Sequence, residues 1–93
     1  MGTFHQGKGE LHGITVVVDT NGPKVYVGRC HEMTDAGIVL MDVDEHTDGE
    51  DGQSKAEYIQ RAAEYGVWKK HSRLVVSQAE IASVRRLGDI GVR

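Results

Sequence analysis

The sequence holds few residues that could perform chemistry, and the first candidate is an adjacent cysteine and histidine. Cys30 and His31 are of the types that serve as thiolate nucleophile and general base. Neighbours on a β-strand point to opposite faces, however, so the two side chains cannot pair if this segment is extended. Cys30 is the sole cysteine, and we expect it to be a small core residue.

An acidic segment is the second candidate. Six carboxylates and no lysine or arginine lie between Asp42 and Asp51. The order of residues 44–49 is similar to the first half of a calcium-binding loop, but Lys55 stands where such a loop places its bidentate glutamate. The five histidines show no metal-ligand spacing, and the sequence contains no phosphate-loop, nucleophile-elbow or zinc motif. We therefore expect a solvated acidic loop, no metal, no cofactor and no enzymatic activity.

Basic residues gather near the C-terminus. Five of them and a single acid, Glu80, lie between positions 69 and 86. Such a cluster could contact the phosphates of single-stranded RNA, although a net charge of −3 argues against a non-specific nucleic-acid binder. The alternative is that these residues are ordinary charged ends of strands. The cluster consists of Lys69, Lys70, Arg73, Arg85 and Arg86.

Length and composition indicate one small domain. The chain has 93 residues, of which 39% are hydrophobic and 27% charged, and this suits one modest core. We expect a flexible arm over residues 1–12, one folded domain over residues 13–87 and a tail over residues 88–93. No apolar run is long enough for a membrane span, and the first ten residues do not resemble a secretory signal. One cysteine gives no disulfide, so the expected compartment is the cytoplasm.

The first half of the chain predicts a three-stranded meander. Residues 14–19, 24–33 and 38–43 are rich in β-branched or alternating apolar residues, and the first turn contains Asn-Gly. Gly28 lies within the second strand, which predicts a sharp bend or a close approach of two backbones. Gly37 follows the second strand in a turn and is placed to adopt a positive φ.

A polar loop over residues 44–53 and a short helix over residues 54–65 are expected next. Ser54 and Glu57 have the spacing of a capping box. Trp68 follows the helix, and we expect it to pack the helix against the sheet, the alternative being an interface anchor or a base-stacking platform. The apolar face of the helix comprises Ala56, Ile59, Ala62, Ala63 and Gly66.

Two short strands complete the chain. Residues 73–77 and 81–87 are apolar or alternating, with a brief polar interruption between them. A second helix over residues 77–87 is the alternative, because Ser77 and Glu80 also have the spacing of a capping box.

This order of elements resembles the Sm-like (LSm) family, over residues 13–87. The first family motif is matched by residues 25–30, 34–37 and 38–40, and the second by the apolar frame of residues 76–84. The resemblance implies a small, strongly bent five-stranded barrel of the Sm-like or SH3-like kind, with the helix inserted between strands 3 and 4. The family's RNA-contacting asparagine aligns with Gly37 and its Arg-Gly pair with Ser77 and Gln78, so this chain lacks the usual RNA-contacting residues.

The resemblance also implies self-association. Family members pair the fourth strand of one subunit with the fifth strand of the next, which predicts a homo-oligomer of about five to seven subunits. The expected function is a ring-forming, non-enzymatic module that binds single-stranded RNA, and the alternative is a protein-interaction scaffold without RNA binding. The expected interface residues are Leu74, Val75, Val76, Ile81 and Val84.

Overall fold

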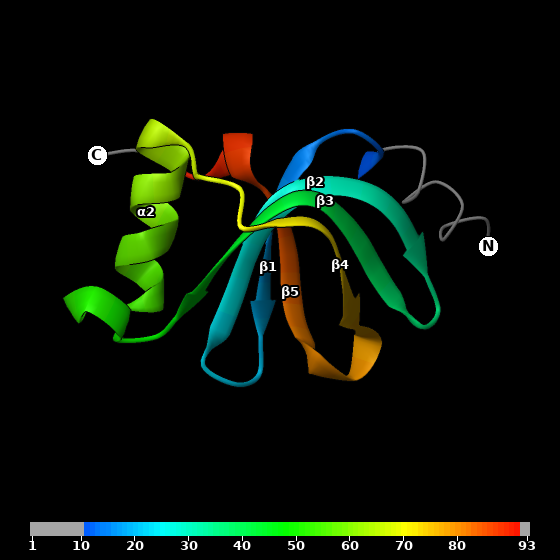
Figure 1. The fold of residues 1–93 in the computed structure, drawn as a ribbon, viewed down its shortest axis with the longest axis horizontal. Coiled ribbons are helices and arrows are strands. Elements are labelled where there is room, and N and C mark those ends of the chain that lie inside the picture. Colours follow the sequence, from blue (N-terminus) through cyan, green and yellow to red (C-terminus); the bar gives the residue numbers. More distant parts are fainter. Residues whose placement is uncertain (1–10, 92–93) are drawn as a thin grey trace.

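Three antiparallel strands form the centre of the fold in the computed structural model, which describes residues 11–91 (Figure 1). They are β1 (Thr15–Thr20), β2 (Lys24–Thr34) and β3 (Gly37–Thr47). β1 pairs with β2, and β2 with β3, through tight turns. The β-branched residues of β1 suit a strand whose side chains are packed on both faces. The predicted meander is confirmed.

The sheet bends sharply where β2 and β3 cross the middle of the molecule. The β2–β3 register shifts at Gly28, and Asp42 on β3 has a φ of +53°. A Cβ atom on Gly28 would lie 3.1 Å from the Met41 carbonyl oxygen and 3.1 Å from Val43 Cγ2. The predicted close approach of backbones at Gly28 is therefore confirmed.

β3 is longer than expected. The predicted polar loop over residues 44–53 is wrong for its first four residues, which pair with β2 and extend β3 to Thr47. Asp44 and His46 are buried because the helix covers this end of the strand. The polar connection is thereby reduced to residues 48–54, which include the short 3₁₀ turn η1 (Glu50–Gly52).

The predicted helix is confirmed as α2 (Lys55–Tyr65), and Ser54 caps it. The Ser54 hydroxyl accepts a hydrogen bond from the Glu57 backbone N–H, and the Glu57 side chain accepts one from the Ser54 N–H. The buried face differs from the predicted one: Tyr58 is buried and Ala56 is exposed. Tyr58 can be buried because its hydroxyl has a hydrogen-bond partner on β3.

The last two strands lie at opposite edges of the sheet. β4 (His71–Ser77) pairs with β3, and β5 (Ile81–Arg86) pairs with β1, which gives the strand order β4-β3-β2-β1-β5. The alternative helix over residues 77–87 is wrong. Only the 3₁₀ turn η2 (Gln78–Glu80) forms there, and Ser77 makes no side-chain cap. A further 3₁₀ turn, η3 (Leu87–Asp89), follows β5.

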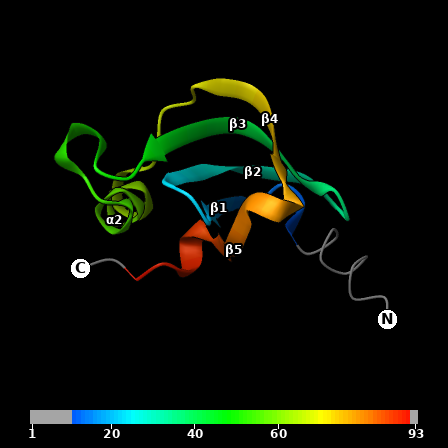
Figure 2. The ribbon, with the colours of Figure 1, turned by 90° about the horizontal axis from the view of Figure 1, so that it is seen from below.

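Two clusters of buried residues form the core. In Figure 2, β3 and β4 lie on one side of β2, and β1 and β5 lie on the other, while α2 covers one end of the sheet. The first cluster contains Cys30, which is 1% exposed, so its predicted core position is confirmed. Burial also raises the pKa of the Cys30 thiol. The first cluster is Val16, Val18, Cys30, Ile38, Leu40, Val43 and Val76, and the second, beneath α2, is Val17, Val25, Val27, Tyr58, Ile59 and Ala62.

Packing extends past the predicted ends of the domain. Leu11 packs against the first cluster, and its carbonyl oxygen accepts a hydrogen bond from the Ile14 N–H at 2.9 Å. At the other end, Ile90 packs against the second cluster. The rest of the predicted arm, residues 1–10, and the last two residues of the predicted tail lie outside the described residues. In the described part of the chain, no helix has the length and apolar character of a membrane span.

Candidate functional site

β4 is a free edge of the sheet. It pairs with β3 on one side, and no strand of residues 11–91 pairs with its other side. Val75 is 53% exposed and Leu74 is half-buried. Val76, one of the expected interface residues, is only 2% exposed because it lies opposite Ile38 in the first core cluster. The edge therefore presents a free backbone and the Val75 side chain.

β5 is the other free edge. It pairs with β1 alone among the described strands. Ile81 and Val84 are half-buried, because each packs against the first core cluster. The predicted interface residues are thus divided between the two edges of one sheet.

The predicted basic residues are divided in the same way. Arg73 lies on β4, whereas Arg85 and Arg86 lie on β5. All three are exposed, and none forms an ion pair with another residue of the described region. Within one chain they do not form a single surface.

Lys69 and Lys70 differ from the arginines because acids lie beside them. Lys69 Nζ is 3.6 Å from Asp42 Oδ1, and Lys70 Nζ is 3.8 Å from Asp44 Oδ1. Asp42 also accepts a hydrogen bond from the Arg29 guanidinium, which holds the pKa of the Asp42 carboxyl below its usual range. The positive charge of the two lysines is therefore partly balanced.

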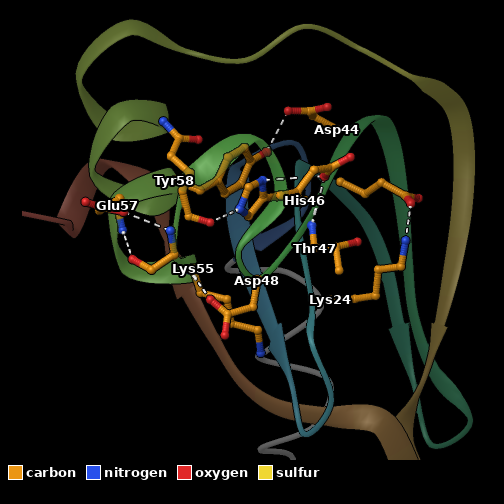
Figure 3. Close-up of polar contacts among 12 residues, drawn as sticks. Lys24, Asp44, His46, Thr47, Asp48, Lys55, Glu57 and Tyr58 are labelled. Carbon is orange, nitrogen blue, oxygen red and sulfur yellow. Dashed lines mark hydrogen bonds and ion pairs between the residues drawn. The ribbon is translucent and has the colours of Figure 1, made fainter.

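A buried polar cluster joins β3 to α2 (Figure 3). The Tyr58 hydroxyl donates to Asp44 Oδ2 at 2.7 Å, and the Tyr58 ring stacks on His46 at a centroid distance of 4.6 Å. His46 Nε2 lies 2.9 Å from the Gln53 carbonyl oxygen, an arrangement in which the ring nitrogen donates. Burial, followed by the hydrogen bond to Asp44, raises the pKa of Tyr58, so its phenol remains a donor.

A pocket of about 470 Å³ opens beside this cluster, between β3, α2 and the segment that follows α2. Asp44 and Tyr58 contribute to its lining. So does Trp68, which was expected to pack α2 against the sheet; that expectation is wrong, because Trp68 is 89% exposed. Val67 packs beneath α2 instead, and Gly66, with a φ of +80°, turns the chain out of the helix.

This pocket was not predicted from the sequence. Asp44 was assigned to a solvated loop, and Tyr65 was not placed on the apolar face of the helix. The available signal was the presence of two aromatic residues, Tyr65 and Trp68, on either side of a glycine at a helix end. Within residues 11–91, no group of three or more potential metal ligands is arranged to hold a metal ion.

Comparison of the structure with solved structures finds an Sm-like archaeal protein from Pyrobaculum aerophilum, with a TM-score of 0.55 and 18% sequence identity. The match covers 84% of this chain. The chain has an Sm-like fold. The same match spans only 46% of the archaeal protein, so the two are not similar over the latter's whole length. No family model matches the sequence. No curated protein matches it either.

The Sm-like fold brings together the two sequence motifs of the resemblance. Gly37 lies opposite Ser77 in the β3–β4 ladder, and the Gln78 N–H donates to the Ala36 carbonyl oxygen at 2.8 Å. The sequence resemblance aligns these positions with the RNA-contacting residues of the Sm-like family. Here they carry a glycine, a serine and a glutamine.

Proposed function

We propose that the chain is a non-enzymatic Sm-like module that assembles with copies of itself into a closed ring of about five to seven subunits. The observation that best supports this is the pair of unpartnered sheet edges, β4 and β5. Open edges expose backbone donors and acceptors that another strand can pair with. Because the two edges are different surfaces, a contact between them is head-to-tail, and such contacts form rings when the rotation closes.

The apolar residues of the edges favour the same contact. Val75 is 53% exposed, and Leu74, Ile81 and Val84 are half-buried. Each apolar Å² removed from water contributes about 25 cal/mol, so covering these side chains adds to the backbone hydrogen bonds of a shared ladder. With a single cysteine and this fold, the proposed compartment is the cytoplasm.

Sedimentation of the full chain tests self-association. We expect the parent to sediment as an oligomer at micromolar concentrations and Val75→Lys to shift it toward monomer, because a charged side chain blocks pairing of an edge strand. Val75→Pro should act in the same way by removing a backbone donor. Ala56→Lys, an exposed change on α2 away from both edges, is the matched control. A monomeric parent at high micromolar concentration would refute the proposal.

RNA binding is the second part of the proposal, and the exposed arginines favour it. Arg73 lies on β4 and Arg85 and Arg86 on β5, so contact between the two edges of neighbouring copies would place all three in one interface region. Lys69 and Lys70 add positive charge next to β4, although Asp42 and Asp44 partly balance it. Such a surface would contact the phosphates of single-stranded RNA.

A gel shift with short single-stranded RNA at two salt concentrations tests this part. Binding should weaken steeply at the higher salt, because neutralised phosphates release counterions. The combined change of Arg73, Arg85 and Arg86 to Gln should reduce both the affinity and the salt dependence, whereas Arg61→Gln on α2 should not. An oligomer that binds no RNA even at low salt would support the alternative hypothesis, a protein-interaction scaffold without RNA binding.

A further inference from the structure

The pocket beside α2 lies apart from both sheet edges and has the size of a small-molecule site. Its volume of about 470 Å³ falls within the range of about 300–1,000 Å³ typical of ligand pockets. It is formed by the insertion between β3 and β4 and not by the turns that carry the Sm-like motifs. Its chemically distinctive lining residues are Asp44, Asp51, Tyr58, Arg61, Tyr65 and Trp68.

Two exposed aromatic side chains line the pocket. Tyr65 is 76% exposed and Trp68 is 89% exposed, and with Val75 they are the large hydrophobic residues exposed in the described part of the chain. An aromatic ring that remains in water in the folded protein leaves a large apolar face uncovered. Two such rings along one pocket offer a ligand apolar faces to stack on.

A largely buried carboxylate contributes to the lining of the pocket. The Asp44 side chain is only 12% exposed, and its Oδ2 atom accepts the hydrogen bond from Tyr58. Lys70 Nζ, at 3.8 Å from Oδ1, is too far for a hydrogen bond, so Oδ1 keeps capacity for a further donor. Asp51 places a second carboxylate in the same lining.

The chain already contains an example of the interaction that such a pocket offers. The Arg61 guanidinium lies over the Tyr65 ring, with 5.9 Å between Cζ and the ring centroid. This distance is typical of a cation–π contact. An indole ring binds a cation more strongly than a phenol ring does, so Trp68 is a better cation–π partner than Tyr65. No cationic side chain of residues 11–91 lies over the Trp68 ring.

We propose that this pocket binds a guanidinium group, with its flat face on the Trp68 ring and its N–H groups donating to Asp44. A guanidinium matches both features, because it stacks on aromatic rings and donates to carboxylates in a fixed planar geometry. A nucleotide base could also stack on Trp68, but the lining carries two carboxylates against the single guanidinium of Arg61, so a phosphate would meet a net negative charge. The guanidinium is carried either by a separate arginine-containing molecule or by the exposed Arg85 or Arg86 of a second copy.

The single tryptophan of the chain provides the assay. Its indole N–H gives one resonance in a ¹H–¹⁵N NMR spectrum, and titration with N-acetyl-arginine amide should move that resonance saturably. The citrulline analogue, which is neutral and nearly the same shape, should leave it in place at equal ionic strength. Uridine monophosphate tests for a nucleotide site, and a response to it alone would overturn the proposal.

Variants locate the binding atoms. Asp44→Asn keeps an acceptor for Tyr58 but removes the charge, and it should weaken arginine-amide binding about tenfold, the effect expected for a charge-assisted hydrogen bond. Tyr65→Leu should weaken binding while Trp68 still reports. Asp35→Asn, an exposed change at the β2–β3 turn, removes the same charge far from the pocket and should have no effect.

A dilution series without ligand distinguishes the two sources of the guanidinium. If a second copy supplies it, the indole resonance should shift with protein concentration, and the combined change of Arg85 and Arg86 to Gln should abolish that shift. A response to the arginine compound supports the site. A dilution shift supports it only if the Arg85 and Arg86 change abolishes the shift and Val75→Lys, which separates copies joined through their sheet edges, leaves it in place. No shift with dilution, together with no difference between the arginine and citrulline compounds up to about 20 mM, would overturn the proposal.

Discussion

Removal of the Tyr58 hydroxyl should destabilise the fold measurably. The residue is 8% exposed, and its hydroxyl donates at 2.7 Å to Asp44, whose side chain is only 12% exposed. Tyr58→Phe keeps the ring and its stacking on His46, so the change removes one hydrogen bond to a charged acceptor. Such a bond contributes about 1.5–3 kcal/mol. At about 2 kcal/mol, the melting temperature of a domain of this size should fall by roughly 8–16 °C.

Thermal and urea unfolding at one fixed protein concentration measure this effect, because association would otherwise change the apparent stability. Tyr26→Phe is the matched control: Tyr26 is half-buried, and its hydroxyl forms no hydrogen bond with another described residue. A double-mutant cycle with Asp44→Asn should show coupling of at least about 0.5 kcal/mol. The reasoning would be refuted if Tyr58→Phe and Tyr26→Phe both stayed within about 0.5 kcal/mol of the parent.

Three further predictions follow from local geometry. Ser54→Ala should cost about 1 kcal/mol of unfolding free energy in urea titrations, because it removes one half of the capping box. Gly37→Ala should lower the free energy of unfolding by about 3 kcal/mol or more, since a Cβ atom there would lie 2.1 Å from the Val76 carbonyl oxygen at a φ of +155°. The same change should weaken the hydrogen-exchange protection of β4. The hydrogen bond from Lys24 lowers the pKa of Glu45 in the folded protein. The ionised Glu45 side chain therefore adds to folding stability above its unfolded pKa of about 4.3, and this stability is lost as pH falls through the lower pKa of the folded state. Glu45→Gln should therefore flatten the acid limb of a stability–pH profile.

The strands and the helix could be predicted because their signals are local. β-branched runs, an Asn-Gly turn and a capping box each depend on residues within a few positions of one another. The resemblance in the order of elements then indicated the Sm-like fold, which the structural comparison supports. Ends of elements were less well predicted: β3 continues to Thr47 because β2 and α2 provide partners for its polar residues.

The candidate site could not be predicted in the same way. Trp68 and Tyr58 are both aromatic and lie ten positions apart, yet one is exposed and the other is buried. The two residues differ in their surroundings. Asp44 accepts a hydrogen bond from the Tyr58 hydroxyl, whereas Gly66 turns the chain out of the helix before Trp68, which stays exposed. Neither relation is visible as a periodicity in the sequence.

By itself, the sequence determined which segments are strands or helix, their order, the cap of α2 and the positions where glycine is needed. These features depend on local backbone preferences and on the alternation of apolar residues. Only the tertiary structure decided the rest. Arg73 and the pair Arg85 and Arg86 lie on opposite edges because β4 and β5 pair with different inner strands. Asp44 and Trp68 share a pocket because the bent sheet carries α2 over the end of β3. Both outcomes depend on long-range pairing, which a pattern over a few neighbouring residues does not encode.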